Sequence, residues 1–313
     1  MRVQATSLFT YALGFLAMAF WGMSFIWTKQ CFVFLSPLAT IFFRLVLSSA
    51  ILFLYLIVSK KLIHIRREDR LRMLATSFFS PFLYFLGENY GLELVTPTTA
   101  SIIIATIPLI TPFSAALFLS ERLTWVNVAG IIISFTGVLA LIITPDLRLG
   151  ADPFGVALLF LAVASATGYS LLVRRLSEAY TPIQIIAWQN LIGSALFLPW
   201  FLWLDLPDWN PTVLLQPGLL LPLLQLAVFA SSLAFIFFIR LIREVGVSKA
   251  SVTSNLIPVV TALGAFWIMH EAFTWLKLSG MAVVIAGVAL AQMQGLKRKN
   301  PPVEATSIVR NTP

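Results

Sequence analysis

The chain has 313 residues, of which 59% are hydrophobic and 11% charged, and its mean hydropathy is +0.93. A soluble domain carries roughly 45–50% apolar and about 25% charged residues, so this composition excludes a soluble enzyme or a soluble nucleic-acid-binding protein. The net charge of +8 does not change that conclusion, because the basic residues lie in short connections between long apolar runs.

Ten apolar runs follow one another along the chain, and each is long enough to cross a bilayer. A spanning helix needs about 20 mainly apolar residues. The sequence therefore predicts an all-α integral membrane protein with ten transmembrane helices. The predicted spans are 11–30, 37–58, 72–93, 98–119, 125–144, 153–174, 182–204, 217–239, 247–269 and 275–294.

The first run also admits a second interpretation. Its Ala17-Met18-Ala19 triplet is similar to the cleavage motif of a secretory signal peptide. The apolar residues continue beyond it through Trp27, and their pattern returns later in the chain, which favours an uncleaved first helix.

Basic residues gather in alternate connections between the predicted spans. The positive-inside rule places such connections in the cytoplasm, and both termini with them. The connection at 205–216, which then lies outside, contains Asp205 and Asp208 but no Lys or Arg. The residues assigned to the cytoplasmic side are Lys60, Lys61, Arg66, Arg67, Arg70, Arg72, Arg122, Arg174, Arg175, Arg240, Arg243, Lys249, Lys297, Arg298 and Lys299.

A Glu-x-x-Thr-Trp phrase occurs twice, at residues 121–125 and 271–275. It belongs to a longer repeat at a constant offset of 150, which aligns residues 95–138 with 245–288 without a gap. Matched positions include Ala100-Ser101 and Ala250-Ser251, Ile107-Pro108 and Ile257-Pro258, Gly130 and Gly280, and Gly137-Val138 and Gly287-Val288.

The beginnings of the two halves match at an offset of 145, which places Ser36-Pro37 on Thr181-Pro182 and Arg44 on Gln189. Each half holds five spans, an odd number, so the second half enters the membrane upside down. We expect two inverted five-helix repeats, at 1–145 and 146–296, followed by a disordered cytoplasmic tail at 297–313. Inverted repeats that enclose a central cavity are suited to alternating access.

These features resemble the EamA-type branch of the drug/metabolite transporter superfamily. The resemblance covers residues 11 to 294 and includes Trp21-Gly22-x-x-Phe25-x-x-x-Lys29 in the first helix and Pro37 through Arg44 in the second. It implies a secondary transporter of small metabolites in the bacterial inner membrane, commonly an exporter of amino acids, with a multidrug or nucleoside exporter as the alternative. Residues 11–30 hold no Asp or Glu, so the proton-exchange mechanism of the short multidrug branch does not carry over.

Two kinds of residue are predicted to matter along the pathway. Pro108 and Pro258 occupy matched mid-span positions, where proline is expected to kink the helix and release a carbonyl. Arg44 and Glu88 are ionisable groups at similar depth, and such groups usually face a partner or a cavity. We expect them either to neutralise one another or to leave Arg44 for a substrate carboxylate.

Aromatic and polar side chains near mid-span are candidates for a binding cavity. The full set of predicted pathway residues is Trp21, Phe25, Arg44, Tyr84, Glu88, Thr106, Pro108, Tyr169, Trp188, Gln189, Gln225, Asn255 and Pro258.

Other function classes have weaker support in the sequence. An intramembrane enzyme would need a base for Ser194, and the two histidines, His64 and His270, are predicted to lie at the membrane boundaries. The single cysteine, Cys31, gives neither a disulfide nor a metal cluster, so we expect no cofactor and no metal. A receptor or scaffold remains an alternative, and the coupling ion is open.

Overall fold

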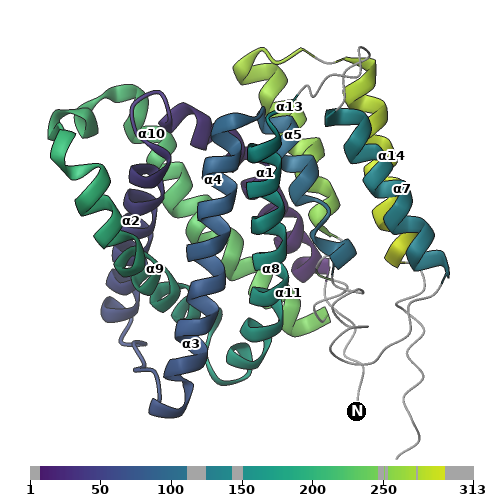
Figure 1. Ribbon diagram of the computed structural model, residues 1–313. Coiled ribbons are helices and arrows are strands. Elements are labelled where there is room, and N and C mark those ends of the chain that lie inside the picture. The colour runs from purple at the N-terminus through teal and green to yellow at the C-terminus, as the bar shows by residue number, and fades with distance from the viewer. Residues whose placement is uncertain are drawn as a thin grey trace, which may run out of the picture.

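The computed structural model describes residues 8–110, 125–142, 151–245, 250, 253–272 and 274–292. Within these ranges the regular structure is helical and contains no strand. Figure 1 shows the helices packed into one bundle, with α7 and α14 side by side at its edge. The predicted all-α class is confirmed.

The helices of the first half, with the labels of Figure 1, are α1 (Leu8–Cys31), α2 (Pro37–Val58), α3 (Arg70–Ser77), α4 (Tyr84–Leu94), α5 (Pro97–Ile104) and α7 (Trp125–Ile142). Those of the second half are α8 (Pro153–Ala179), α9 (Pro182–Leu204), α10 (Pro217–Gln225), α11 (Ala234–Val245), α13 (Ile257–Met269) and α14 (Trp275–Gln292). Short 3-10 segments lie at Arg67–Asp69, Leu206–Asp208, Pro211–Leu215 and Thr253–Leu256.

Two spans contain a π-helical segment. Phe78–Leu83 joins α3 to α4, and Leu226–Leu233 joins α10 to α11. The first segment is interrupted by a kink, because Ser80 has extended backbone angles (φ −145°, ψ 122°). The two segments lie at corresponding places in the two halves. π-Helical segments are rare and occur frequently at functional sites.

The predicted spans agree closely with the helices. α2 and α9 begin and end at the predicted residues, whereas α8 continues past residue 174 to Ala179. Five helical stretches in the described part are long and apolar enough to cross a membrane. Residues 111–119, 143–144, 247–249, 251–252 and 293–294 of the predicted spans lie outside the described residues.

The repeat is visible in how the second helix of each half begins. The Ser36 side chain accepts a hydrogen bond from the Ala39 backbone N–H, and the Thr181 side chain accepts one from that of Gln184. A proline follows each cap, where its missing N–H costs no helical hydrogen bond. The matched Ser-Pro and Thr-Pro pairs thus build the same helix start twice.

Helix contacts follow the same symmetry. α1 packs against α11 and α13, and its counterpart α8 packs against α4 and α5. The remaining main contacts, α2 with α9 and α7 with α14, each join a helix to its own counterpart. The two halves are therefore interleaved, with the first helix of each packed into the other half.

The α7–α14 pair shows the inverted orientation directly. A Cβ atom on Gly137 would lie 2.8 Å from the Val284 backbone nitrogen, and one on Gly287 would lie 2.4 Å from that of Ser134. Later residues of α7 thus meet earlier residues of α14, and earlier residues of α7 meet later ones. The two equivalent helices run antiparallel, as inverted repeats require.

Candidate functional site

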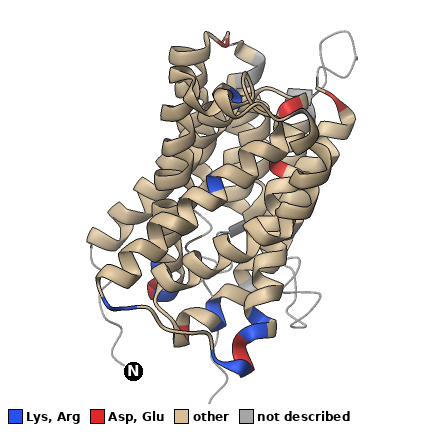
Figure 2. Ribbon diagram, turned by 90° about the vertical axis from the view of Figure 1, so that its left-hand side faces the viewer, with Lys and Arg blue, Asp and Glu red and all other residues tan. Residues whose placement is uncertain are grey.

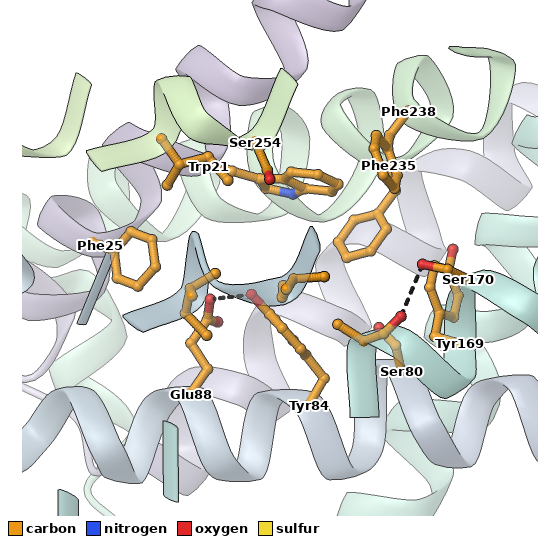
Figure 3. Close-up of a pocket in the computed structure, with 14 residues that line it drawn as sticks. Trp21, Phe25, Ser80, Tyr84, Glu88, Tyr169, Ser170, Phe235, Phe238 and Ser254 are labelled. Carbon is orange, nitrogen blue, oxygen red and sulfur yellow. Dashed lines mark hydrogen bonds between the residues drawn. The ribbon is translucent and has the colours of Figure 1, made fainter. Parts of the chain in front are cut away.

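A pocket lies where α1, α4, α8 and α11 meet the broken spans that contain α5 and α13 (Figure 3). Its wall is mostly aromatic and aliphatic, with a few hydroxyl groups and one carboxylate. The lining residues are Trp21, Phe25, Ser80, Tyr84, Glu88, Ile104, Ile107, Ala166, Tyr169, Ser170, Phe235, Phe238, Ser254 and Ile257. An apolar pocket with few, well-placed polar groups is the usual form of a small-molecule site.

The lining residues are related by the internal repeat. The offset of 145 pairs two residues of α1 with two of α8, and the offset of 150 pairs residues of the later helices. The pairs are Trp21 with Ala166, Phe25 with Ser170, Glu88 with Phe238, Ile104 with Ser254, and Ile107 with Ile257. The pocket therefore lies on the pseudo-two-fold axis between the halves.

The two prolines mark helix breaks rather than the predicted kinks within continuous helices. α5 ends at Ile104, and helix resumes at Ile107, so Pro108 lies in the first turn of the second piece. Pro258 likewise lies in the first turn of α13, after the 3-10 segment. Proline is tolerated in a first turn, where the N–H it lacks has no helical partner. Ile104 and Ser254, the residues four positions before the two prolines, both line the pocket.

Trp21 connects the pocket to the second π-helical segment. Its indole N–H donates a hydrogen bond to the Ala230 carbonyl at 3.2 Å, and its ring packs edge-on against Phe235 and Phe238 at 4.9 and 5.0 Å. A tryptophan held at both its polar and its apolar edge forms a rigid wall.

Glu88 is the carboxylate of the pocket. It is 7% exposed, and its Oε1 accepts a hydrogen bond of 2.8 Å from the Tyr84 hydroxyl, one helical turn earlier (Figure 3). A buried carboxylate is costly in a membrane interior and commonly marks a functional site.

Arg44 lies behind this wall instead of pairing with Glu88. Its Nε donates to the Ser231 hydroxyl at 2.8 Å, and its guanidinium carbon lies 4.2 Å from the centre of the Phe85 ring. No salt bridge joins Arg44 to Glu88 in the described part of the chain, so the two charges interact electrostatically without direct contact. The Phe85 ring holds the guanidinium, and the Tyr84 hydroxyl holds the carboxylate.

Five of the sequence-predicted residues line the pocket: Trp21, Phe25, Tyr84, Glu88 and Tyr169. Gln189 does not line the pocket but contacts a residue that does. Its Oε1 accepts a hydrogen bond of 3.5 Å from the Tyr169 hydroxyl, and its buried Nε2 has no hydrogen-bond partner. Trp188 lies at the edge of the bundle, where its indole N–H donates to the Ile63 carbonyl. Trp188 belongs to α9, but its ring packs against Phe53 of α2, and it does not line the pocket.

Three further candidates also lie off the pocket wall. The Thr106 hydroxyl donates to the Ile103 carbonyl at the break after α5. Asn255 belongs to the 3-10 segment before α13 and has a buried, unpartnered Oδ1. Gln225 is the last residue of α10, directly before the π-helical segment.

Several pocket residues were not among the sequence predictions, and the repeat could have found some of them. Adding 145 to Trp21 and Phe25 gives Ala166 and Ser170, and adding 150 to Glu88 gives Phe238. Ser80 and Phe235 carry no such signal, because the repeat offsets relate them to no other pocket residue. Ser80 lies at the kink within Phe78–Leu83, and Phe235 lies near the start of α11. No group of three or more metal-binding side chains occurs among the described residues.

Comparison with known proteins agrees with this arrangement. The model of the EamA-like transporter family matches residues 8–143 and again residues 153–293. The chain belongs to the EamA-like transporter family. It is a multi-pass membrane protein of a transporter family, and the predicted membership of the drug/metabolite transporter superfamily is confirmed.

Two relatives and one structure illustrate the similarity. An uncharacterized transporter of Archaeoglobus fulgidus is 27% identical over 87% of this chain and 95% of its own length. A probable terminal-alkyne amino-acid exporter of Streptantibioticus cattleyicolor is 27% identical over 67% of this chain and 69% of its own length. One solved crystal structure matches with a TM-score of 0.67 over 91% of this chain and 98% of that chain, at 17% identity, and so shares the fold.

The position of Arg44 predicts a structural phenotype. Arg44→Gln should lower the free energy of unfolding by about 1–3 kcal/mol, because the variant loses the charge-assisted hydrogen bond to Ser231 and the contact with the Phe85 ring. It should not weaken the binding of an uncharged pocket ligand, because Arg44 does not line the pocket and acts on Glu88 only electrostatically. Thermal melting and ligand titration of the same preparation measure both quantities. A tenfold loss of affinity with unchanged melting would show instead that Arg44 contacts the substrate.

Proposed function

We propose that this EamA-family protein is a secondary active transporter that exports amino acids or related small compounds by alternating access through the pocket. Trp21, Phe25, Tyr84, Glu88 and Tyr169 form the core of the substrate pathway. The other predicted pathway residues act from outside the pocket wall, as supports or at the helix breaks.

The observation that carries this proposal is the symmetry of the pocket wall. Each half contributes its first helix, its π-containing span and its broken span, at equivalent positions. Exchange of conformation between the halves would open the same pocket to the opposite membrane face. Breaks at Ala105–Thr106 and Thr253–Leu256 give the two spans places at which to bend.

Substrate class follows from the wall and from one relative. The aromatic lining suits an apolar or aromatic side chain, and Glu88 suits an amine. The Streptantibioticus relative is named a probable amino-acid exporter, which supports amino acids as the first class to test. A lipophilic cation exporter is the second candidate, favoured by the combination of aromatic rings with a single carboxylate.

Orientation follows from the basic residues. Figure 2 shows much of the Lys and Arg colour at the lower end of the bundle. With the positive-inside rule, that end faces the cytoplasm, and both termini are cytoplasmic. The host membrane that the family resemblance implies is a bacterial inner membrane.

A single reporter cysteine tests alternating access. Cys31→Ala removes the one native cysteine, and Ser170→Cys then places a thiol in the pocket wall. In sealed vesicles, a membrane-impermeant maleimide should label Ser170→Cys from either face, and a transported amino acid should slow the reaction. As the control, Ser59→Cys, just after α2, should react from one face regardless of substrate. Labelling of the pocket thiol from one face alone, with no uptake of amino acids, nucleosides or cationic drugs, would reject transport.

A further inference from the structure

Glu88 has one oxygen that the protein leaves free for a ligand. Oε1 accepts the Tyr84 hydroxyl, whereas Oε2 has no hydrogen-bond partner among the described residues. The side chain is 7% exposed, and Figure 3 shows it directed into the pocket, on the wall opposite Trp21. An unpartnered carboxylate oxygen in an apolar cavity needs a hydrogen-bond donor.

The groups around Glu88 leave few sources for that donor. Arg44, on α2, acts on it electrostatically without contact, and Tyr84 already donates to Oε1. α8 contributes the Tyr169 phenol, which is bound to Gln189. The residues that line the pocket from α1, α5, α11 and α13 are apolar, aromatic or hydroxyl-bearing and include no titratable side chain.

We propose that Glu88 binds the ammonium group of the substrate in exchange for a proton, so that the proton is the coupling ion; this inference rests on the proposed transport function. In the empty pocket the carboxyl group carries a proton. When an amine binds, the O–H bond breaks, the proton leaves to the aqueous phase, and the ammonium N–H groups hydrogen-bond to the carboxylate. At the other face the steps reverse.

The pocket geometry explains why the two cations compete. The repeat equivalent of Glu88 is Phe238, so the lining contains one carboxylate that can be neutralised. A proton and an ammonium group cannot both neutralise it. Trp21 and Phe25 present aromatic rings to the same space, and such rings favour an organic cation. One proton therefore exchanges for one ammonium group.

Three probes with the same aromatic body test the proposal by calorimetry on purified wild-type protein. 2-Phenylethylamine carries an ammonium group, phenylalanine carries both charges, and 3-phenylpropionate carries a carboxylate only. Between about pH 5.5 and pH 8.5, the affinity for both amines should rise with pH, approaching tenfold per unit. Titrations in two buffers of different ionisation enthalpy should show up to one proton released per amine bound. 3-Phenylpropionate should release none.

Variants assign the effect to Glu88. Glu88→Gln should bind the amines at least about tenfold more weakly at high pH, release no proton, and lose the pH dependence. Glu88→Asp keeps a carboxylate and should retain proton release if the amide variant does not fold. Glu93→Gln, an exposed residue of the same helix, is the matched control and should behave as wild type.

The outcomes separate this inference from the transport proposal. Amine binding without proton release, unchanged affinity in Glu88→Gln, or failure of either amine to bind would overturn the role of Glu88. Flux of phenylalanine into vesicles with no opposing proton movement would keep transport and reject proton exchange. Absence of flux for every solute tested, with amine binding and proton release intact, would reject transport while keeping the Glu88 site.

Discussion

Gly287→Ala is expected to destabilise the protein by about 3 kcal/mol, because a single methyl group would strike backbone. A Cβ atom at this position lies 2.4 Å from the Ser134 nitrogen and 2.8 Å from the Gly130 carbonyl oxygen. Neither atom belongs to a flexible side chain, so α7 and α14 must move apart. The gain in helix propensity from Gly to Ala, about 1 kcal/mol, does not offset that separation.

The matched control is the same substitution at another helical glycine. A Cβ atom on Gly264 would meet the Met23 sulfur at 3.0 Å and an Ile26 side-chain carbon at 3.1 Å. Both neighbours can change rotamer, so Gly264→Ala should lower stability by less than about 1 kcal/mol. Size-exclusion profiles and melting curves compare the variants. Equal melting temperatures would show that the α7–α14 contact is looser than its geometry indicates.

Asn190→Leu is expected to cost about 2–3 kcal/mol, because it leaves a buried carbonyl without a donor. The Asn190 amide donates to the Ser48 hydroxyl at 2.6 Å and to the Ser231 carbonyl at 3.0 Å. Ser48 in turn contacts the Ser232 hydroxyl at 2.6 Å. These bonds join α2 and α9 to the π-helical segment, in a membrane interior where water is not available to replace them.

Asn210→Ala provides the control for Asn190→Leu. Asn210 is exposed and caps a short 3-10 segment, so its loss should cost less than about 1 kcal/mol. Because the network positions the segment that precedes Phe235, Asn190→Leu should also slow transport beyond what the folded fraction explains. Melting curves and vesicle flux per folded molecule check both parts. Wild-type flux at reduced stability would limit Asn190 to a structural role.

The sequence predicted the large-scale order of this protein correctly. The composition identified a membrane protein. The first residues of α2 and α9, Pro37 and Pro182, were predicted correctly, because a capping residue followed by proline marks a helix start within a few residues of sequence. The Glu-x-x-Thr-Trp phrase exposed the repeat. Trp125 and Trp275 are indeed the first residues of equivalent helices, exposed by 88% and 87% as interfacial anchors would be.

The details of the pathway were harder to predict. Trp188 and Tyr169 are both aromatic and near mid-span by count, yet only Tyr169 lines the pocket. A helix that is apolar all round has no polar stripe to indicate which face points inward. Arg44 and Glu88 have similar depth, but depth does not fix direction, and the Phe85 ring lies against the guanidinium.

By itself, the sequence determined the all-helical membrane class, the repeat and its inversion, because hydropathy, odd span number and residue matches are properties of the chain alone. Only the tertiary structure decided which residues meet at the pocket. That choice depends on helix rotation, on the two breaks and on the π-helical segments, all of which are set by packing between residues far apart in sequence. The repeat offsets link sequence to tertiary structure. When they are applied to the pocket residues Trp21, Phe25 and Glu88, they give the equivalent pocket residues of the other half.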